Sequence, residues 1–326
     1  MILVKSPLRV SFLGGGTDFP SYFLQRGGAV ISTTIDKHVY VALNIRNDKS
    51  IRVSYSKTEE TSDVSSLDHD IIREILLKYR IETNLEIVTI ADMSTKGTGL
   101  GSSSSLSAAV ICGVKNLLNI QYNSRDLAME ACELEIKTLN KPIGMKDQYI
   151  SAYGGFNKIK FLANGDVVVE PIKFTNINLN EISKWFKLLA VNTRQSASES
   201  LMETIDSIND SKKQIYFNEI YSLIDDLHQN FVKFEPKNIG QIINIGWKLK
   251  KEFGKSISNQ QIDFLIDRLL GEGLLGAKLV GAGGGGFVLL FAEPDWYRNK
   301  LDPKLQNKIM DLNLGVEGTR LVYRDS

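Results

Sequence analysis

The sequence predicts an α+β protein, and three observations support this class. Strand-like segments rich in Val, Ile, Thr and Tyr at residues 1–13, 29–45 and 50–55 follow one another before the first helical pattern. Helical patterns then fill most of residues 197–271. Strands and helices do not alternate strictly along the chain, so a single doubly wound parallel sheet is not expected.

The other elements of the first half follow from apolar spacing and turn chemistry. Apolar residues at helical spacing between Leu67 and Tyr79 predict an amphipathic helix. Further expected elements, in chain order, are a strand at 85–91 and helices at 106–118, 124–139 and 145–153. Gly154-Gly155 supplies a left-handed cap for the last of these helices. Asn164-Gly165, between two strand-like runs, predicts a hairpin with a two-residue loop.

A length of 326 residues favours two domains, which we place at residues 1–180 and 181–326. A strand expected at 186–192 is followed by a capping box, Ser196-Ala197-Ser198-Glu199, which starts the long helices. Two strands expected at 278–281 and 287–292 are joined by a glycine-rich turn, and a last helix and strand close the chain.

Composition argues against several classes of partner. The chain is 43% hydrophobic and 24% charged, which is typical of soluble globular proteins, and its net charge of +1 gives no reason to expect nucleic acid or an anionic membrane. Cys112 and Cys132 lack metal-ligand spacing and are expected to be reduced. No apolar run approaches the roughly 18 residues that span a bilayer, and Lys5, Pro7 and Arg9 interrupt any signal-peptide core. We expect a cytoplasmic protein with a small-molecule partner and leave its oligomeric state open.

One loop carries the strongest chemical signal. Between a strand-like run and a helical pattern the chain reads Gly97-Thr98-Gly99-Leu100-Gly101-Ser102-Ser103-Ser104-Ser105. Alternating glycines let the backbone approach an anion, and the first helical turn offers unpaired N–H groups at the positive end of the helix dipole. A flexible turn with capping serines is the alternative for the loop taken alone. We interpret residues 97–105 as a binding site for nucleotide phosphates and call them the phosphate loop.

Two more glycine-rich segments accompany the phosphate loop. The first runs from Pro7-Leu8-Arg9 to Gly14-Gly15-Gly16-Thr17-Asp18, and the third is Gly281-Ala282-Gly283-Gly284-Gly285-Gly286. The third matches a dinucleotide fingerprint as a string, but a strand follows it where a helix is required. In this order the three segments resemble the signature motifs of the GHMP kinases, named for galactokinase, homoserine kinase, mevalonate kinase and phosphomevalonate kinase.

This resemblance implies a fold, a reaction and a set of residues. The fold would be a ribosomal-protein-S5-like N-terminal domain followed by a ferredoxin-like C-terminal domain, with ATP and substrate between them. ATP would bind at Gly97 to Ser104, and Mg²⁺ would bind to Ser103 and Glu135, both oxygen donors of the kind Mg²⁺ prefers. Asp147 would accept or orient the proton of the acceptor hydroxyl, and Arg9 would hold Asp147 ionised and stabilise the transferred phosphoryl group.

The first motif carries the information about the acceptor. Galactokinases have Gly-Glu-His-Thr-Asp where this chain has Gly14 to Asp18, so the side chains missing at two positions would leave room for a longer or phosphorylated sugar. This version of the motif looks most like bacterial D-glycero-D-manno-heptose 7-phosphate kinases, which phosphorylate the anomeric hydroxyl. Fucokinase-like domains and a non-catalytic sugar and ATP sensor remain alternatives. The residues expected at the substrate are Gly15, Gly16, Thr17, Asp18, Gly283, Gly284 and, for the substrate's own phosphate, Arg194.

Overall fold

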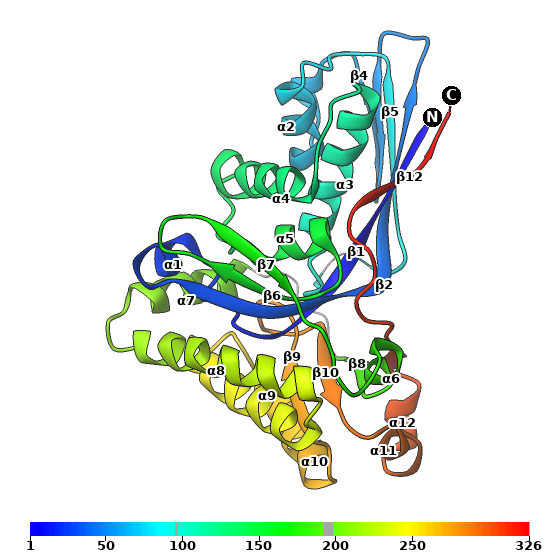
Figure 1. The fold of residues 1–326 in the computed structure, drawn as a ribbon. Helices are drawn as coiled ribbons and strands as arrows, with labels where there is room; N and C mark the ends of the chain where they lie inside the picture. The colour runs from blue at the N-terminus through cyan, green and yellow to red at the C-terminus, as the bar shows by residue number, and fades with distance from the viewer. Residues whose placement is uncertain (95–96, 192–197, 326) are drawn as a thin grey trace.

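The structure is a computed structural model that describes residues 1–94, 97–191 and 198–325. Its elements form two halves, each with helices packed on a sheet, and Figure 1 shows one half above the other. Both sheets are built mainly from antiparallel pairs, and helices and strands do not alternate as in a doubly wound sheet. The α+β class predicted from the sequence is therefore confirmed.

The first half holds an eight-stranded sheet with the order β12-β1-β2-β5-β3-β4, from which β6 and β7 branch beside β2. Its strands are β1 (Ile2–Leu13), β2 (Gly28–Ile45), β3 (Ile51–Ser54), β4 (Thr58–Thr61), β5 (Leu85–Ala91), β6 (Phe156–Phe161), β7 (Val167–Pro171) and β12 (Arg320–Arg324). Of these described strands, only β3 and β5 pair in parallel. The long strands β1 and β2 pair with each other at the centre of this half, and the sequence predicts both strands.

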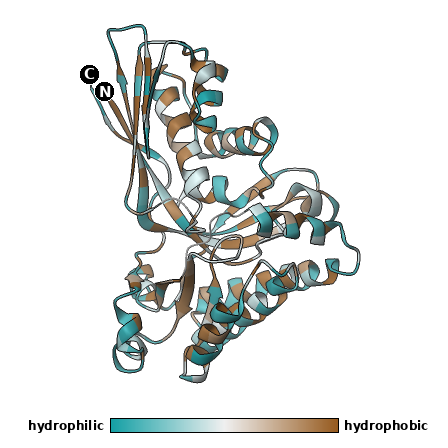
Figure 2. Cartoon of the chain, turned by 180° about the vertical axis from the view of Figure 1, so that it is seen from behind, coloured by the Kyte–Doolittle hydropathy of each residue, from teal (hydrophilic) through white to brown (hydrophobic). Residues whose placement is uncertain are grey.

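Helices cover one face of this sheet. They are α1 (Pro20–Arg26), α2 (Asp70–Lys78), α3 (Ser102–Leu117), α4 (Ser124–Cys132), a π-helical turn (Glu133–Thr138) and α5 (Lys146–Tyr153), with a short 3₁₀ turn at Val64–Ser66. Helix α3 packs on β1 and β2, and a Cβ at Gly113 would lie only 2.3 Å from the Leu43 side chain. Figure 2 shows hydrophobic residues gathered along the strands and along α3, where the two layers meet.

The predicted hairpin at Asn164-Gly165 forms, but its loop is longer than two residues. The pair Phe161 and Val167 ends the ladder of β6 and β7, and Leu162 N then donates to Asp166 O at 2.8 Å. Gly165 has a φ of +92° and its N–H donates to Leu162 O at 2.9 Å, which makes a three-residue loop. Because Asn164 does not take a positive φ, the two-residue type I′ turn is replaced by the next most common hairpin loop.

The second half holds a four-stranded antiparallel sheet with the order β11-β8-β10-β9. Its strands are β8 (Phe186–Ala190), β9 (Gly276–Leu279), β10 (Phe287–Phe291) and β11 (Ile309–Asp311). Its helices are α6 (Leu179–Ser183), α7 (Ser198–Asn209), α8 (Gln214–Lys233), α9 (Pro236–Lys251), α10 (Gln260–Gly271), α11 (Pro294–Asn299) and α12 (Pro303–Gln306). Strand β9 ends two residues before the predicted limit, although Val280 N still donates to Phe287 O at 2.8 Å. In the described part of the chain no helix combines the length and apolar character needed to cross a membrane.

The two halves share one hydrophobic core and a buried lysine. The ring of Phe12 on β1 lies 5.0–5.1 Å from the rings of Phe156, Phe186 and Phe231, which come from both halves. Beside it the register of β1 against β2 shifts between Ser11 and Leu13. Lys278 of β9 donates to the carbonyl oxygens of Ser11 (2.9 Å) and Phe12 (3.1 Å), so the second sheet is fastened to β1 at this irregularity.

The last strand returns to the first sheet. Strand β12 pairs antiparallel with β1 from Ile2↔Arg324 to Lys5↔Arg320, and Figure 1 shows both ends of the chain at this edge. The link between the halves lies between Pro171 and Phe186, the end of β7 and the start of β8. The division into residues 1–180 and 181–326 stays a prediction, with β12 as a segment of the second range that lies in the first sheet.

Candidate active site

A cavity of about 450 Å³ opens where the two halves meet. Its walls come from β1, the first motif, the phosphate loop, the start of α5, helix α7, the end of α9 and the third motif. The sequence-predicted residues that line it are Arg9, Gly15, Gly16, Gly97, Gly99, Leu100, Gly101, Ser102, Ser103, Ser104, Glu135 and Asp147. The three predicted motifs therefore converge on one space. Arg194 lies outside the described residues.

The phosphate loop has the geometry expected of an anion site. Gly97, Gly99 and Gly101 all have positive φ angles, between +71° and +79°, and α3 begins at the next residue, Ser102. Helix α3 is 16 residues long, and Ser102, Ser103 and Ser104 of its first turn line the cavity at the positive end of the helix dipole. Thr98 is the predicted nucleotide residue that does not line the cavity, and its buried hydroxyl has no hydrogen-bond partner within the described chain.

The third motif supports this loop from the other half. A Cβ on Gly281 would lie 2.5 Å from the Cα of Gly99, and one on Gly286 would lie 2.7 Å from the Gly97 and Thr98 carbonyl oxygens. Two backbones in such close contact exclude side chains, which explains the glycines. Gly281 and Ala282 line the cavity, whereas Gly283 and Gly284 pack on Ile257, and their assignment to the substrate stays a prediction.

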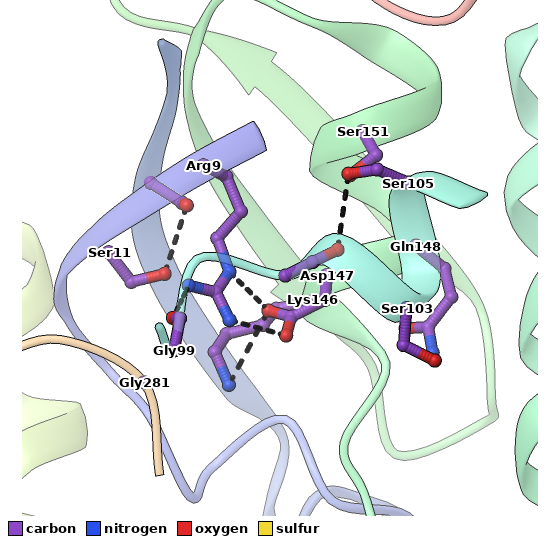
Figure 3. Close-up of polar contacts among 12 residues, drawn as sticks. Arg9, Ser11, Gly99, Ser103, Ser105, Lys146, Asp147, Gln148, Ser151 and Gly281 are labelled. Carbon is purple, nitrogen blue, oxygen red and sulfur yellow. Dashed lines mark hydrogen bonds and ion pairs between the residues drawn. The ribbon is translucent and has the colours of Figure 1, made fainter. Parts of the chain in front are cut away.

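Arg9 and Asp147 form the charged centre of the cavity. The Arg9 guanidinium donates from Nε and Nη2 to the two carboxylate oxygens of Asp147 at 2.7 and 2.5 Å, and from Nη1 to Gly99 O at 2.5 Å. Figure 3 shows Arg9 reaching from β1 to Asp147, with Lys146 beside the pair. Burial alone would raise the pKa of Asp147, but the charges of Arg9 and Lys146 outweigh burial and lower the pKa to about 2. Asp147 is therefore ionised at neutral pH.

A second polar group lies at the start of α3. The Ser103 hydroxyl donates to Oε1 of Glu135, and the amide of Gln148 donates to Oε2 at 2.8 Å. Glu135 is fully buried. The Lys141 ammonium lies 3.4 Å from Ser103 Oγ and 3.7 Å from Glu135 Oε1, so a cation already faces this pair. One hydroxyl and one carboxylate fit Mg²⁺, which keeps several waters and uses substrate phosphates as further ligands. The described residues hold no cluster of three or more His, Cys, Asp or Glu that would favour another metal.

Thr17 and Asp18 of the first motif face away from the cavity. The Thr17 hydroxyl donates to Gly14 O and Ala29 O, both at 2.9 Å. Asp18 is fully buried, and its carboxylate accepts from Gly16 N at 2.9 Å and from the Lys146 ammonium at 3.1 Å. Both side chains therefore fix the backbone of the motif, and their assignment to the substrate stays a prediction.

The two glycines of this motif that line the cavity differ in their surroundings. A Cβ on Gly16 would meet the rings of Phe217 and Phe253 at 2.8 and 2.9 Å, and Gly16 has a φ of +106°. A Cβ on Gly15 would have no heavy atom within 4 Å among the described residues. Open space therefore lies beside Gly15, while two stacked aromatic rings fill the space at Gly16, and the room for a longer acceptor stays a prediction.

Comparison with protein families agrees with this geometry. The model described as GHMP kinases N terminal domain matches residues 69–155, and the model described as GHMP kinases C terminal matches residues 227–301. The chain belongs to the GHMP kinases. Members of this family are phosphotransferases with hydroxyl acceptors, so the reaction class expected from the three motifs is confirmed.

Individual relatives of this GHMP kinase include sugar kinases. D-glycero-alpha-D-manno-heptose 7-phosphate kinase of Campylobacter jejuni is 26% identical over 333 residues, covering 98% of each chain. The bifunctional fucokinase/GDP-fucose pyrophosphorylase of Arabidopsis thaliana is 26% identical over 93% of this chain, which spans 31% of that protein.

Solved structures show the same fold. A crystal structure of a D-glycero-D-manno-heptose 1-phosphate kinase from Bacteroides thetaiotaomicron superimposes with a TM-score of 0.79 at 23% identity, covering all of both chains. Lactococcus lactis galactokinase with galactose gives a TM-score of 0.76 at 16% identity, covering 98% of this chain and 94% of that one. The two-domain GHMP fold predicted from the resemblance is confirmed.

Several cavity residues of this GHMP kinase were not assigned a role from the sequence. They are Phe19, Lys141, Lys146, Leu201, Thr204, Lys250 and Phe253. Lys146 stands next to Asp147 in the chain, so its position beside a charged centre could have been noticed. Lys250 and Phe253 lie at the end of a long amphipathic helix, where neither spacing nor a neighbouring motif distinguishes them from surface or core residues.

Proposed function

We propose that this GHMP kinase is an ATP-dependent sugar 1-kinase that phosphorylates the anomeric hydroxyl of D-glycero-D-manno-heptose 7-phosphate to the 1,7-bisphosphate. The observation that carries the proposal is the Arg9–Asp147 pair, which lines one cavity together with the phosphate loop and contacts that loop at Gly99 O. Phosphoryl transfer needs a neutralised donor and an oriented acceptor hydroxyl, and little covalent work by the protein. Asp147, Arg9 and the loop meet these needs.

In this proposal each group has a defined task. The phosphate loop binds the phosphates of ATP through backbone N–H groups, and Ser103 and Glu135 hold Mg²⁺, which supplies charge neutralisation when bound. Asp147 orients the acceptor hydroxyl and accepts its proton as the new oxygen–phosphorus bond forms and the bond to ADP breaks. Because both Asp147 oxygens already accept bonds from Arg9, Asp147 is a weak base, and orientation is its main contribution.

Two features support a phosphorylated or long sugar as acceptor. The space beside Gly15 admits substituents on the sugar. Lys146 lines the cavity, and its ammonium group binds Asp18, which does not line the cavity. The heptose 7-phosphate kinase from Campylobacter jejuni aligns over nearly the full chain. The product would serve GDP-heptose synthesis for capsule or surface polysaccharides, in the cytoplasm, where ATP is available.

A fucokinase-like activity on an unphosphorylated sugar is the second candidate, because the Arabidopsis fucokinase relative aligns over 93% of this chain. A non-catalytic sensor of sugar and ATP fits less well. Such a protein has no need for a complete catalytic set, and Arg9, Ser103, Glu135 and Asp147 all line this cavity.

A panel of sugars and sugar phosphates with ATP and Mg²⁺ tests the proposal, with phosphorus NMR to locate the new phosphate. The expected product is the heptose 1,7-bisphosphate, with little turnover of sugars that lack the terminal phosphate. Efficient turnover of fucose would replace this proposal with the second candidate. Nucleotide binding without turnover of any sugar in the panel would favour the sensor.

A further inference from the structure

The second half contributes a charged side chain to the cavity. Lys250 lies in the last turn of α9 and lines the cavity together with Arg9, Lys146 and Asp147. Its ammonium donates a hydrogen bond to the carbonyl oxygen of Gly281, the residue whose backbone rests against the phosphate loop. Lys250 therefore stands where the third motif meets the loop.

The charge of Lys250 acts on the reacting centre. Burial tends to raise the pKa of Asp147, and Lys250 is one of the cations that lower it, after Arg9 and Lys146. These three cations come from β1, the start of α5 and α9, so they surround Asp147 from three elements. A site that gathers positive charge around a single carboxylate and opposite a helix N-terminus is suited to a multiply charged anion.

The chemistry of the side chain suits phosphate. An ammonium group is a compact, fixed positive charge with N–H donors, the chemistry that phosphate oxygens attract. The next residue, Lys251, is on the same helical turn but does not line the cavity, and its ammonium lies 3.1 Å from Asp263.

We propose that Lys250 binds phosphate oxygens of the ligand in this cavity and so makes the second half part of the phosphoryl-transfer site. The inference rests on the proposed function for the identity of the ligands. Those oxygens come either from the γ-phosphate of the nucleotide or from the acceptor's own phosphate, and both sources present the same chemistry to an ammonium group.

The test compares Lys250→Gln and Lys250→Met with Lys251→Met. Glutamine keeps an N–H donor for Gly281 and removes the charge, while Lys251→Met makes the same change one residue away. Calorimetry measures the Kd for ADP and for a non-hydrolysable ATP analogue, and steady-state kinetics measures KM for phosphorylated and unphosphorylated acceptors. Lys250→Arg, which keeps the charge, should recover part of the lost affinity.

Loss of one charge-assisted hydrogen bond to a ligand weakens the binding of that ligand by about tenfold to a hundredfold. If Lys250 binds the γ-phosphate, its variants weaken the ATP analogue by this factor and leave ADP unchanged. If it binds the acceptor's phosphate, both nucleotides bind normally and KM rises for the phosphorylated acceptor alone. Equal losses of affinity for every ligand in a variant whose Tm is also lower, or no loss of affinity for any ligand, would overturn the proposal. The nucleotide arm requires no acceptor, so it separates this result from a failure of the proposed function.

Discussion

At the scale of single residues, the carboxylate of Asp147 is fixed in position by two neighbouring cations. Arg9 binds both of its oxygens, and Lys146 lies 3.9 Å from one of them. A carboxylate fixed in this way cannot rotate away from an acceptor hydroxyl, which lowers the entropic barrier to a productive alignment. The same contacts keep it ionised, since the pKa is lowered to about 2. We therefore expect no loss of activity from protonation of Asp147 at any pH above about 4.

Replacement of Asp147 by Asn is expected to lower kcat by about 10²–10⁴-fold, because it removes both the orientation of the acceptor hydroxyl and the group that accepts its proton. The amide cannot accept the proton, and it leaves Arg9 without its buried anionic partner. Binding of ADP, measured by calorimetry, should change little because the phosphate loop is untouched. Asp166→Asn, at the exposed hairpin, is the matched control. Near-normal turnover in Asp147→Asn would remove Asp147 from the mechanism.

Replacement of Glu135 by Gln tests the metal assignment. The variant keeps the size of the side chain and an acceptor for Ser103, but it removes the negative charge that would bind Mg²⁺. We expect the Mg²⁺ concentration for half-maximal activity to rise at least about tenfold, and the effect of Mg²⁺ on the calorimetric Kd for ADP to shrink. Glu133→Gln, at a partly exposed ion pair with Lys78, is the control. An unchanged response to Mg²⁺ would exclude Glu135 as a ligand.

Four residues of the candidate site could be predicted from the sequence, whereas the orientation of Asp18 could not. Asp147, Arg9, Ser103 and Glu135 could be predicted because each stands at a fixed place in or near a glycine-rich motif. The direction in which a side chain points is a different matter. Whether a carboxylate faces a cavity depends on partners distant in sequence, and for Asp18 the partner is 128 residues away.

At the scale of elements, the site depends on two glycine-rich backbones in contact. Gly99 has a φ of +74°, and a Cβ there would lie 2.6 Å from Val280 O. The phosphate loop therefore takes its shape from the third motif as well as from its own sequence. Local patterns predicted the loop and the helix after it, because helical periodicity is a short-range signal, but the apolar spacing begins at Leu106 whereas α3 already begins at Ser102. The contact between Gly99 and Gly281 spans 182 residues and leaves no local signal.

Gly99→Ala is expected to destabilise the protein and weaken nucleotide binding together. The left-handed conformation alone costs an alanine about 1–2 kcal/mol, and the contact with Val280 O adds to this cost. Urea denaturation measures the first effect, and calorimetry with ADP measures the second. Gly271→Ala is the control, because among the described residues nothing lies within 4 Å of a Cβ there. Equal behaviour of the two variants would show that the loop tolerates a different shape.

At the scale of the whole molecule, Lys278 joins the two halves, and its contribution to the free energy of unfolding depends on pH. Burial, together with the charges of Lys146 and Arg9, lowers the pKa of Lys278 from 10.5 to about 7. Between these two values the unfolded chain holds one proton more than the folded protein. The contribution of Lys278 to the free energy of unfolding therefore rises with pH across this window, by at most about 1.4 kcal/mol per pH unit. Below pH 7 the contribution is constant, because both states are protonated.

Lys278→Met should remove this dependence. Urea denaturation at several pH values between 7 and 10 gives the free energy of unfolding of wild type and variant. The difference between them is expected to grow in favour of wild type as the pH rises. The variant also loses the two donors to Ser11 O and Phe12 O, which costs about 1–3 kcal/mol at every pH. Lys160→Met, at a surface pair with Glu170, is the control, and parallel curves for Lys278→Met and wild type would contradict the assignment.

The pairing of β12 with β1 has a consequence for how the chain is made. During synthesis β1 is complete within the first 13 residues, whereas its neighbour β12 emerges about 300 residues later. Until then one edge of the first sheet presents unpaired N–H and C=O groups, a template on which other chains can add strands. We therefore expect the nascent protein to need chaperones on the ribosome. Polypeptides that end before residue 320 are expected to aggregate through β1.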